Sequence, residues 1–94
     1  MSKLSIWAEI MAERCRQDEK WGPNAQRTVS DEVRLCILAE EVGEVAQSIN
    51  DIRNYDGSSC LHNELVEQLR KELVQVAACA VAWLEIMLQD GVRP

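Results

Sequence analysis

The sequence predicts an all-α fold, a helical bundle of three main helices that dimerisation completes. Residues that favour helix dominate the chain, which has only two Pro and four Gly. Apolar residues recur every three or four positions through three long segments. The length of 94 residues allows a single domain, residues 1–94, with only a small core of its own.

The first predicted helix runs from about Leu4 to about Lys20. Its apolar residues recur at helical spacing, namely Leu4, Trp7, Ile10, Met11 and Cys15. The run Trp21-Gly22-Pro23-Asn24 ends this helix, because Gly and Pro do not continue a helix comfortably. Residues 22–29 are then expected to form a connector.

The second predicted helix begins near Ser30, a good N-cap that precedes Asp31 and Glu32 in the first turn. Its apolar stripe steps by three and four residues in alternation, through Leu35, Leu38, Val42, Val45, Ile49 and Ile52. The turn-forming cluster at residues 54–59 ends the helix.

The third predicted helix runs from about Ser59 to Asp90, where Gly91 suits a C-terminal cap. Its main stripe comprises Leu65, Leu69, Leu73, Val76, Ala80, Trp83 and Met87. Further apolar residues widen that face, namely Val66, Ala77, Leu84 and Leu88. A helix apolar over so much of its circumference needs more than two neighbours. We therefore predict a homodimer or a dimer of dimers with a core like that of a four-helix bundle.

The charge balance and the cysteines exclude several classes of function. With 16 acidic and 10 basic residues the net charge is -6, so neither a nucleic acid nor an anionic membrane surface is an expected partner. No apolar run approaches about 18 residues, so no membrane span is expected. The four cysteines form no CxxC pair, which argues against a zinc ribbon. We expect reduced thiols and a cytoplasmic protein that starts without a signal peptide.

Acidic side chains flank the apolar stripes of the second and third predicted helices. At about 100° per residue, Glu41 and Glu44 lie on one flank of the second helix's stripe, whereas Glu40 points away from it. Glu72 and Gln75 lie together on one flank of the third helix's stripe. If the two helices pack antiparallel, these pairs converge on one pocket.

Three carboxylates beside an apolar core repel one another, and burial raises the cost, so bound cations are expected. Mg²⁺ or Mn²⁺ suits oxygen ligands, and Mg²⁺ keeps water positions open for a phosphate-bearing substrate. The alternative interpretation is an ordinary helix surface, because Glu pairs three residues apart are common there. Glu64 and Glu67 with Arg70 and Lys71 are an example. Gln75 alone is equally typical of a core amide.

The segments EEVGE at 40–44 and ELVQ at 72–75 resemble the Glu-Glu-x-x-Glu and Glu-x-x-Asp motifs of the MazG-like nucleotide pyrophosphohydrolases, the all-α NTP pyrophosphatases. The flanking segments LAEEVGEVAQSI, RKELVQVAACAVAWLE and ERCRQDEKWG are similar to small single-domain members of that family. The resemblance implies a dimeric or tetrameric bundle. It also implies Mg²⁺-dependent hydrolysis of nucleoside triphosphates, non-standard or deoxy ones among them, at the α–β bond. The products would be a monophosphate and pyrophosphate.

The resemblance also implies roles for individual residues. Glu41, Glu44 and Glu72 match the metal ligands and belong to the expected catalytic set. Glu40 matches the first acid of the motif, which implies a supporting or water-orienting role in catalysis. Gln75 stands where the family has Asp, so its amide oxygen offers a metal ligand without a charge. The site would then hold one ion fewer, bind it more weakly, or need another water activator.

Residues near the end of the first predicted helix are candidates for substrate binding. Arg14, Gln17 and Lys20 repeat at helical spacing, and Trp21 suits stacking on a base. The alternative is a polar helix end with an anchoring Trp. Trp7 and Trp83 are expected in the core.

The competing hypothesis for function is a non-catalytic helical module, degenerate at Gln75, that binds nucleotides or a protein partner. A ferritin-like di-iron bundle is set aside because the chain has no Glu-x-x-His pair.

Overall fold

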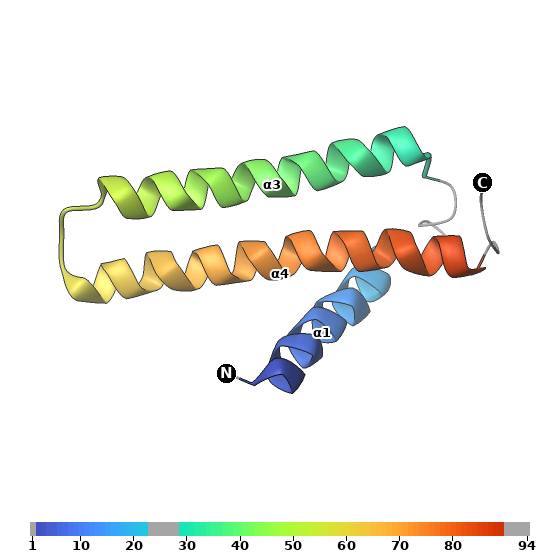
Figure 1. The fold of residues 1–94 in the computed structure, drawn as a ribbon, viewed down its shortest axis with the longest axis horizontal. Coiled ribbons are helices and arrows are strands. Elements are labelled where there is room, and N and C mark those ends of the chain that lie inside the picture. The colour runs from blue at the N-terminus through green and yellow to red at the C-terminus, as the bar shows by residue number, and fades with distance from the viewer. Residues whose placement is uncertain (1, 23–28, 90–94) are drawn as a thin grey trace.

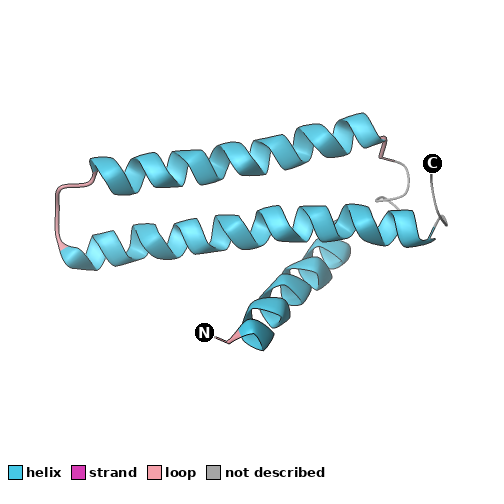
Figure 2. Cartoon of the chain, in the orientation of Figure 1, coloured by secondary structure: helices cyan, strands magenta, loops and turns pink. Residues whose placement is uncertain are grey.

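A computed structural model of the chain describes residues 2–22 and 29–89, and this part of the chain contains helices and no strand. The helices are α1 (Lys3–Trp21), α3 (Asp31–Asn54) and α4 (Ser59–Gln89) (Figure 2). The prediction of an all-α fold is confirmed, and the bounds lie close to the predicted ones. Most of the predicted connector at 22–29, and the cap at Gly91, lie outside the described residues.

Local hydrogen bonds explain where α1 and α3 begin and where α1 ends. The Ser2 hydroxyl accepts from the backbone N–H of Ser5 at 3.1 Å, and the Ser30 hydroxyl accepts from that of Val33 at 3.2 Å. Gly22 has a φ of +81° and donates its N–H to the carbonyl of Asp18 at 2.8 Å. A residue without Cβ adopts this conformation at little cost, which is why α1 ends there.

Helix α4 is the central element of the chain. Close backbone contacts join α4 to α3, which runs antiparallel beside it, and to α1, which packs obliquely against its C-terminal half (Figure 1). Among the described residues no such contact joins α1 to α3. The three helices therefore form an open arrangement, and a large part of the surface of α3 has no neighbour among the described residues.

An ion-pair network fixes α1 on α4. The Arg14 guanidinium is 4% exposed and donates from Nε and Nη2 to the two carboxylate oxygens of Glu85, both at 3.0 Å. It also donates to Asp18 at 3.1 Å and to Gln17 at 3.0 Å. A buried guanidinium needs such partners, and these acceptors use most of its donors. Arg14, a predicted substrate ligand, thus has a structural role between the two helices.

The buried apolar core within one chain is small. In the described part it consists of Ile10 from α1 and Ala78, Ala82 and Ile86 from α4. Trp7, expected in the core, is 60% exposed in the single chain. Trp83 is half-buried and donates its indole N–H to Asp31 at 3.1 Å. All four cysteines are free, as expected for reduced thiols.

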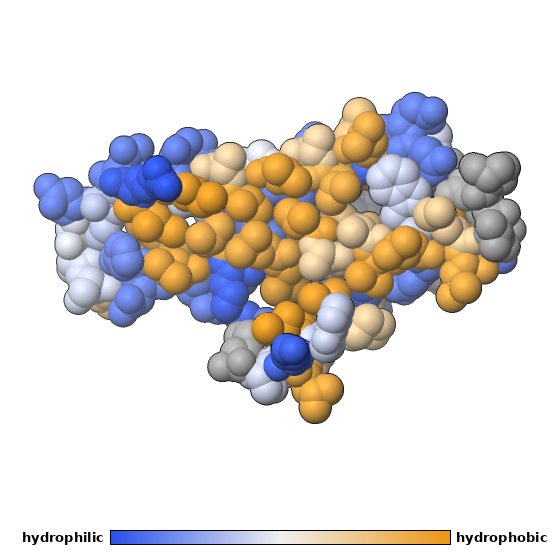
Figure 3. All heavy atoms as spheres, in the orientation of Figure 1, coloured by the Kyte–Doolittle hydropathy of each residue, from blue (hydrophilic) through white to orange (hydrophobic). Residues whose placement is uncertain are grey.

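The apolar stripe of α3 divides into two sets with a period of seven residues. Leu38, Val45 and Ile52 are half-buried, whereas Leu35, Val42 and Ile49 are exposed. Exposed apolar residues continue on α4 at Val66, Leu73, Leu84 and Leu88. Figure 3 shows apolar residues gathered along α3 and α4 on the face in view. This distribution is what a helical hairpin exposes when part of its stripe packs within the chain.

Among the described helices, α4 alone is long and apolar enough to cross a membrane, judged by length and composition. The expectation of no membrane span, which depends on the lack of one unbroken apolar run, stays a prediction, because this criterion also accepts a window that is interrupted by polar residues. The helix carries Glu72 and Glu85, and Glu85 pairs with Arg14 of α1. A core helix that is mostly buried meets the same criterion, whereas 17% of this window is buried within the single chain.

Candidate metal and nucleotide site

Three glutamates from the two antiparallel helices form an acidic cluster. One carboxylate oxygen each from Glu41, Glu44 and Glu72 lie within 4.8 Å of one another. Glu41 and Glu72 are half-buried and Glu44 is exposed. The structure thus brings together the residues that helical spacing placed beside the two stripes. Glu40 is exposed and lies outside this cluster.

The acidic cluster has an uncompensated negative charge. Burial raises the pKa of Glu41, and the negative charges of Glu72, Glu40 and Glu13 raise it further. A hydrogen bond with Glu44 acts in the opposite direction and lowers this pKa. The Glu41 Oε2 atom is buried without a hydrogen-bond partner in the described part of the chain. The pKa of Glu44 is raised to about 7 by its hydrogen bond with Glu72 and by the charges of Glu41 and Glu72. A proton or a cation would relieve the repulsion.

This raised pKa predicts that the metal-free protein loses stability as the pH rises from about 5 to about 8. In that interval the folded state holds a proton at Glu44, whose pKa is about 7, while the unfolded state with its ordinary pKa has released it. The stabilisation from this proton is complete at a pH below the pKa of Glu44 in the unfolded state. It is lost as the pH rises through the pKa of Glu44 in the folded state. Urea unfolding in EDTA across this interval measures the effect.

Two variants control this pH experiment. Glu44→Gln should flatten the dependence, whereas Glu64→Gln, on the exposed surface of α4, should leave it unchanged. A wild-type urea midpoint that stays constant or rises between pH 5 and 8 would contradict the prediction.

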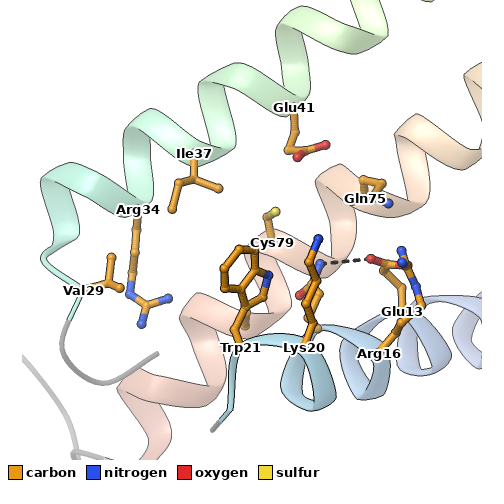
Figure 4. A pocket seen from close by; sticks show the side chains of 12 residues that line it. Glu13, Arg16, Lys20, Trp21, Val29, Arg34, Ile37, Glu41, Gln75 and Cys79 are labelled. Carbon is orange, nitrogen blue, oxygen red and sulfur yellow. Dashed lines mark hydrogen bonds and ion pairs between the residues drawn. The ribbon is translucent and has the colours of Figure 1, made fainter. Parts of the chain in front are cut away.

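A cavity of about 530 Å³ lies next to the acidic cluster and receives side chains from all three helices (Figure 4). Each helix contributes residues three or four positions apart, as expected for one helix face. Its lining comprises Arg34, Ile37 and Glu41 of α3; Gln75, Cys79 and Ala82 of α4; Glu13, Arg16, Gln17, Lys20 and Trp21 of α1; and Val29.

The two ends of the cavity differ in chemistry. Glu41 and Gln75 lie at the end nearest the acidic cluster, whereas Arg34 and Val29 lie at the opposite end (Figure 4). The Trp21 indole lies between them, with the Lys20 ammonium 4.9 Å from its ring centroid. Cys79 also lines the cavity, and burial raises the pKa of its thiol. The cavity thus has the Glu41 carboxylate at one end, the Arg34 guanidinium at the other, and an aromatic ring between them.

The structure brings together most of the predicted site residues. Gln17, Lys20, Trp21 and Gln75 line the cavity, and Glu41 belongs both to its lining and to the acidic cluster. Arg14 is not among the lining residues, and its guanidinium is held by Glu85 and Asp18.

Sequence reasoning did not single out three polar residues of the lining, namely Glu13, Arg34 and Arg16, although Arg16 lies within the predicted substrate-binding segment. Glu13 is four positions before Gln17 and accepts a hydrogen bond from Arg16 Nε at 3.0 Å. Arg34 is seven positions before Glu41, so both lie on one face of α3. Extending the helical spacing from the predicted residues toward the start of each helix would have identified them.

No family model, no curated protein and no solved structure matches the chain. The MazG-like resemblance therefore stays a prediction from the motifs at 40–44 and 72–75.

Proposed function

We propose that the protein is a Mg²⁺-dependent nucleoside triphosphate pyrophosphohydrolase of the MazG-like type, which cleaves the α–β bond. One observation carries the proposal. Carboxylate oxygens of Glu41, Glu44 and Glu72 lie within 4.8 Å of one another, at the end of a cavity lined by cations and an indole ring. A divalent cation bound to oxygens, a polyphosphate and a base would occupy these three environments in that order.

The residues of the acidic cluster fit a hard divalent cation. The donors are oxygens alone, the ligands that Mg²⁺ and Mn²⁺ prefer. The buried Oε2 of Glu41 lacks a hydrogen-bond partner among the described residues, and a cation would satisfy it. When bound, Mg²⁺ would neutralise the polyphosphate and activate water.

Residues around the acidic cluster have supporting roles in this proposal. Gln75 lies in the lining near Glu41, and its amide would offer a neutral oxygen ligand to the cation. Gln68 donates to Glu72 at 2.6 Å and so orients that carboxylate. Glu40 is exposed and acts on the cluster through its charge, which suits a water-orienting group on the solvent side. Arg16 and Lys20 are the cations that would bind the outer phosphates.

We infer that the working form is a homodimer, or a dimer of dimers. The single chain exposes 6866 Å². A folded monomer of its mass, 10.7 kDa, is expected to expose only about 5500 Å². The excess surface includes the period-seven residues Leu35, Val42 and Ile49, which a second α3–α4 hairpin would cover to complete a four-helix core.

The experiment that tests the enzymatic proposal is a panel of nucleoside triphosphates incubated with the protein and Mg²⁺. We expect a monophosphate and pyrophosphate in equal amounts, detected by chromatography, and no products in EDTA. Cleavage to a diphosphate and phosphate would place the reaction at another bond. A folded protein that binds nucleotides but cleaves none would favour the non-catalytic module.

A further inference from the structure

The cavity end farthest from the acidic cluster has the composition of a site for a flat ring. Val29 and Ile37 give it apolar walls, and the indole of Trp21 lies next to them toward the middle of the cavity. Apolar and aromatic walls favour an aromatic ring over a hydrated polyphosphate. We call these three residues and Arg34 the Arg34 end of the cavity.

Arg34 is the charged group at this end. Its side chain is 7% exposed, and it extends from the first turns of α3 toward the space between Val29 and Trp21 (Figure 4). Seven residues of helix separate it from Glu41, which is about 10 Å along the axis. A guanidinium is planar, offers hydrogen-bond donors and has no acceptor. An occupant of the Arg34 end therefore gains most when it presents two neighbouring acceptors.

We propose that the Arg34 end is a nucleobase subsite and that Arg34 makes it select guanine or hypoxanthine over adenine. Guanine and hypoxanthine present O6 and N7 as adjacent acceptors, which a guanidinium binds through two parallel hydrogen bonds. Adenine presents N7 beside an amino group, whose donors face those of the arginine. The proposal rests on the proposed function only in placing the triphosphate at the acidic cluster, which directs the base toward Arg34.

Binding of nucleoside monophosphates tests this subsite without any need for hydrolysis. Titration calorimetry with GMP, IMP and AMP should show that the wild-type protein binds GMP and IMP at least about tenfold more tightly than AMP, the usual range for a bidentate contact. Equal affinities, or no binding of any of the three, would overturn the proposal.

Substitutions at Arg34 separate base recognition from phosphate binding. In Arg34→Gln the amide can donate to N7 and accept from the amino group of adenine, so the preference should reverse toward AMP. Arg34→Lys keeps the charge without the planar fork and should lose the preference. If Arg34 binds phosphate instead, Arg34→Gln should weaken GMP and AMP binding equally while Arg34→Lys preserves both, which would overturn the proposal.

Circular dichroism checks that each Arg34 variant is folded. Even if a variant does not fold, the relative affinities of the wild-type protein for GMP, IMP and AMP decide whether the subsite exists. Base selectivity and hydrolysis also fail separately. A protein that cleaves GTP, ITP and ATP with equal kcat/KM keeps its proposed function and refutes the subsite. A protein that cleaves none but prefers GMP over AMP keeps the subsite and refutes the enzyme.

Discussion

Replacing Glu72 by Gln is expected to lower kcat/KM for every nucleotide by at least about a hundredfold. A group that only orients a metal ligand typically costs 10- to 100-fold in metal affinity or activity when lost, and Glu72 is proposed as a direct ligand. The same substitution should raise the thermal midpoint of the metal-free protein, because it removes a charge that repels those of Glu41 and Glu44. Lower activity together with higher stability distinguishes a functional group from a structural one.

The matched control for this substitution is Glu64→Gln. Glu64 is on the same helix, is exposed and is not a member of the acidic cluster. The activity and the thermal midpoint of the Glu64→Gln variant should therefore match those of the wild type. Glu41→Gln should behave like Glu72→Gln. Unchanged turnover by Glu72→Gln, or a lower midpoint in EDTA, would contradict the assignment of the cluster as a metal site. Colorimetric pyrophosphate release and differential scanning calorimetry give the two measurements.

Helical periodicity was sufficient to predict the helices and the members of the acidic cluster. Ser30, Gly22 and the turn at 54–59 mark helix ends through local hydrogen bonds and backbone freedom, which depend on neighbouring residues only. Glu41 and Glu72 could be placed beside the stripes because the face of a residue depends only on its position along the helix. The spacing therefore predicted which side chains would meet once α3 and α4 packed antiparallel.

The roles of the two buried arginines could not be predicted in this way. Both Arg14 and Arg34 lie at helical spacing from candidate site residues, yet Arg14 binds Glu85 while Arg34 lines the cavity. Glu85 is 71 residues away from Arg14 in the chain. The neighbours of Arg14 depend on the angle at which α1 crosses α4, and this angle follows from tertiary packing. Helical spacing identifies the face of a helix but not the neighbour it meets.

The apolar surface of α3 and α4 leads to the second large effect, the loss of the proposed dimer. Ile49→Glu should convert a protein of twice the chain mass of 10.7 kDa into a monomer with reduced helical content. Ile49 is exposed in the single chain and belongs to the period-seven set proposed to face the partner. Burying an unpaired carboxylate there is unfavourable enough to weaken association at least about a hundredfold. Sedimentation equilibrium measures the mass.

Asn50→Glu is the matched control, because it adds the same charge at the next position of α3, which is exposed and polar. It should leave the dimer intact. A wild-type protein that sediments as a stable monomer at micromolar concentration would contradict the prediction. If the dimer supplies most of the core, the thermal midpoint of the wild type must rise with protein concentration, whereas that of Ile49→Glu must not. A concentration-dependent midpoint would thus link the small core of the single chain to the assembly that completes it.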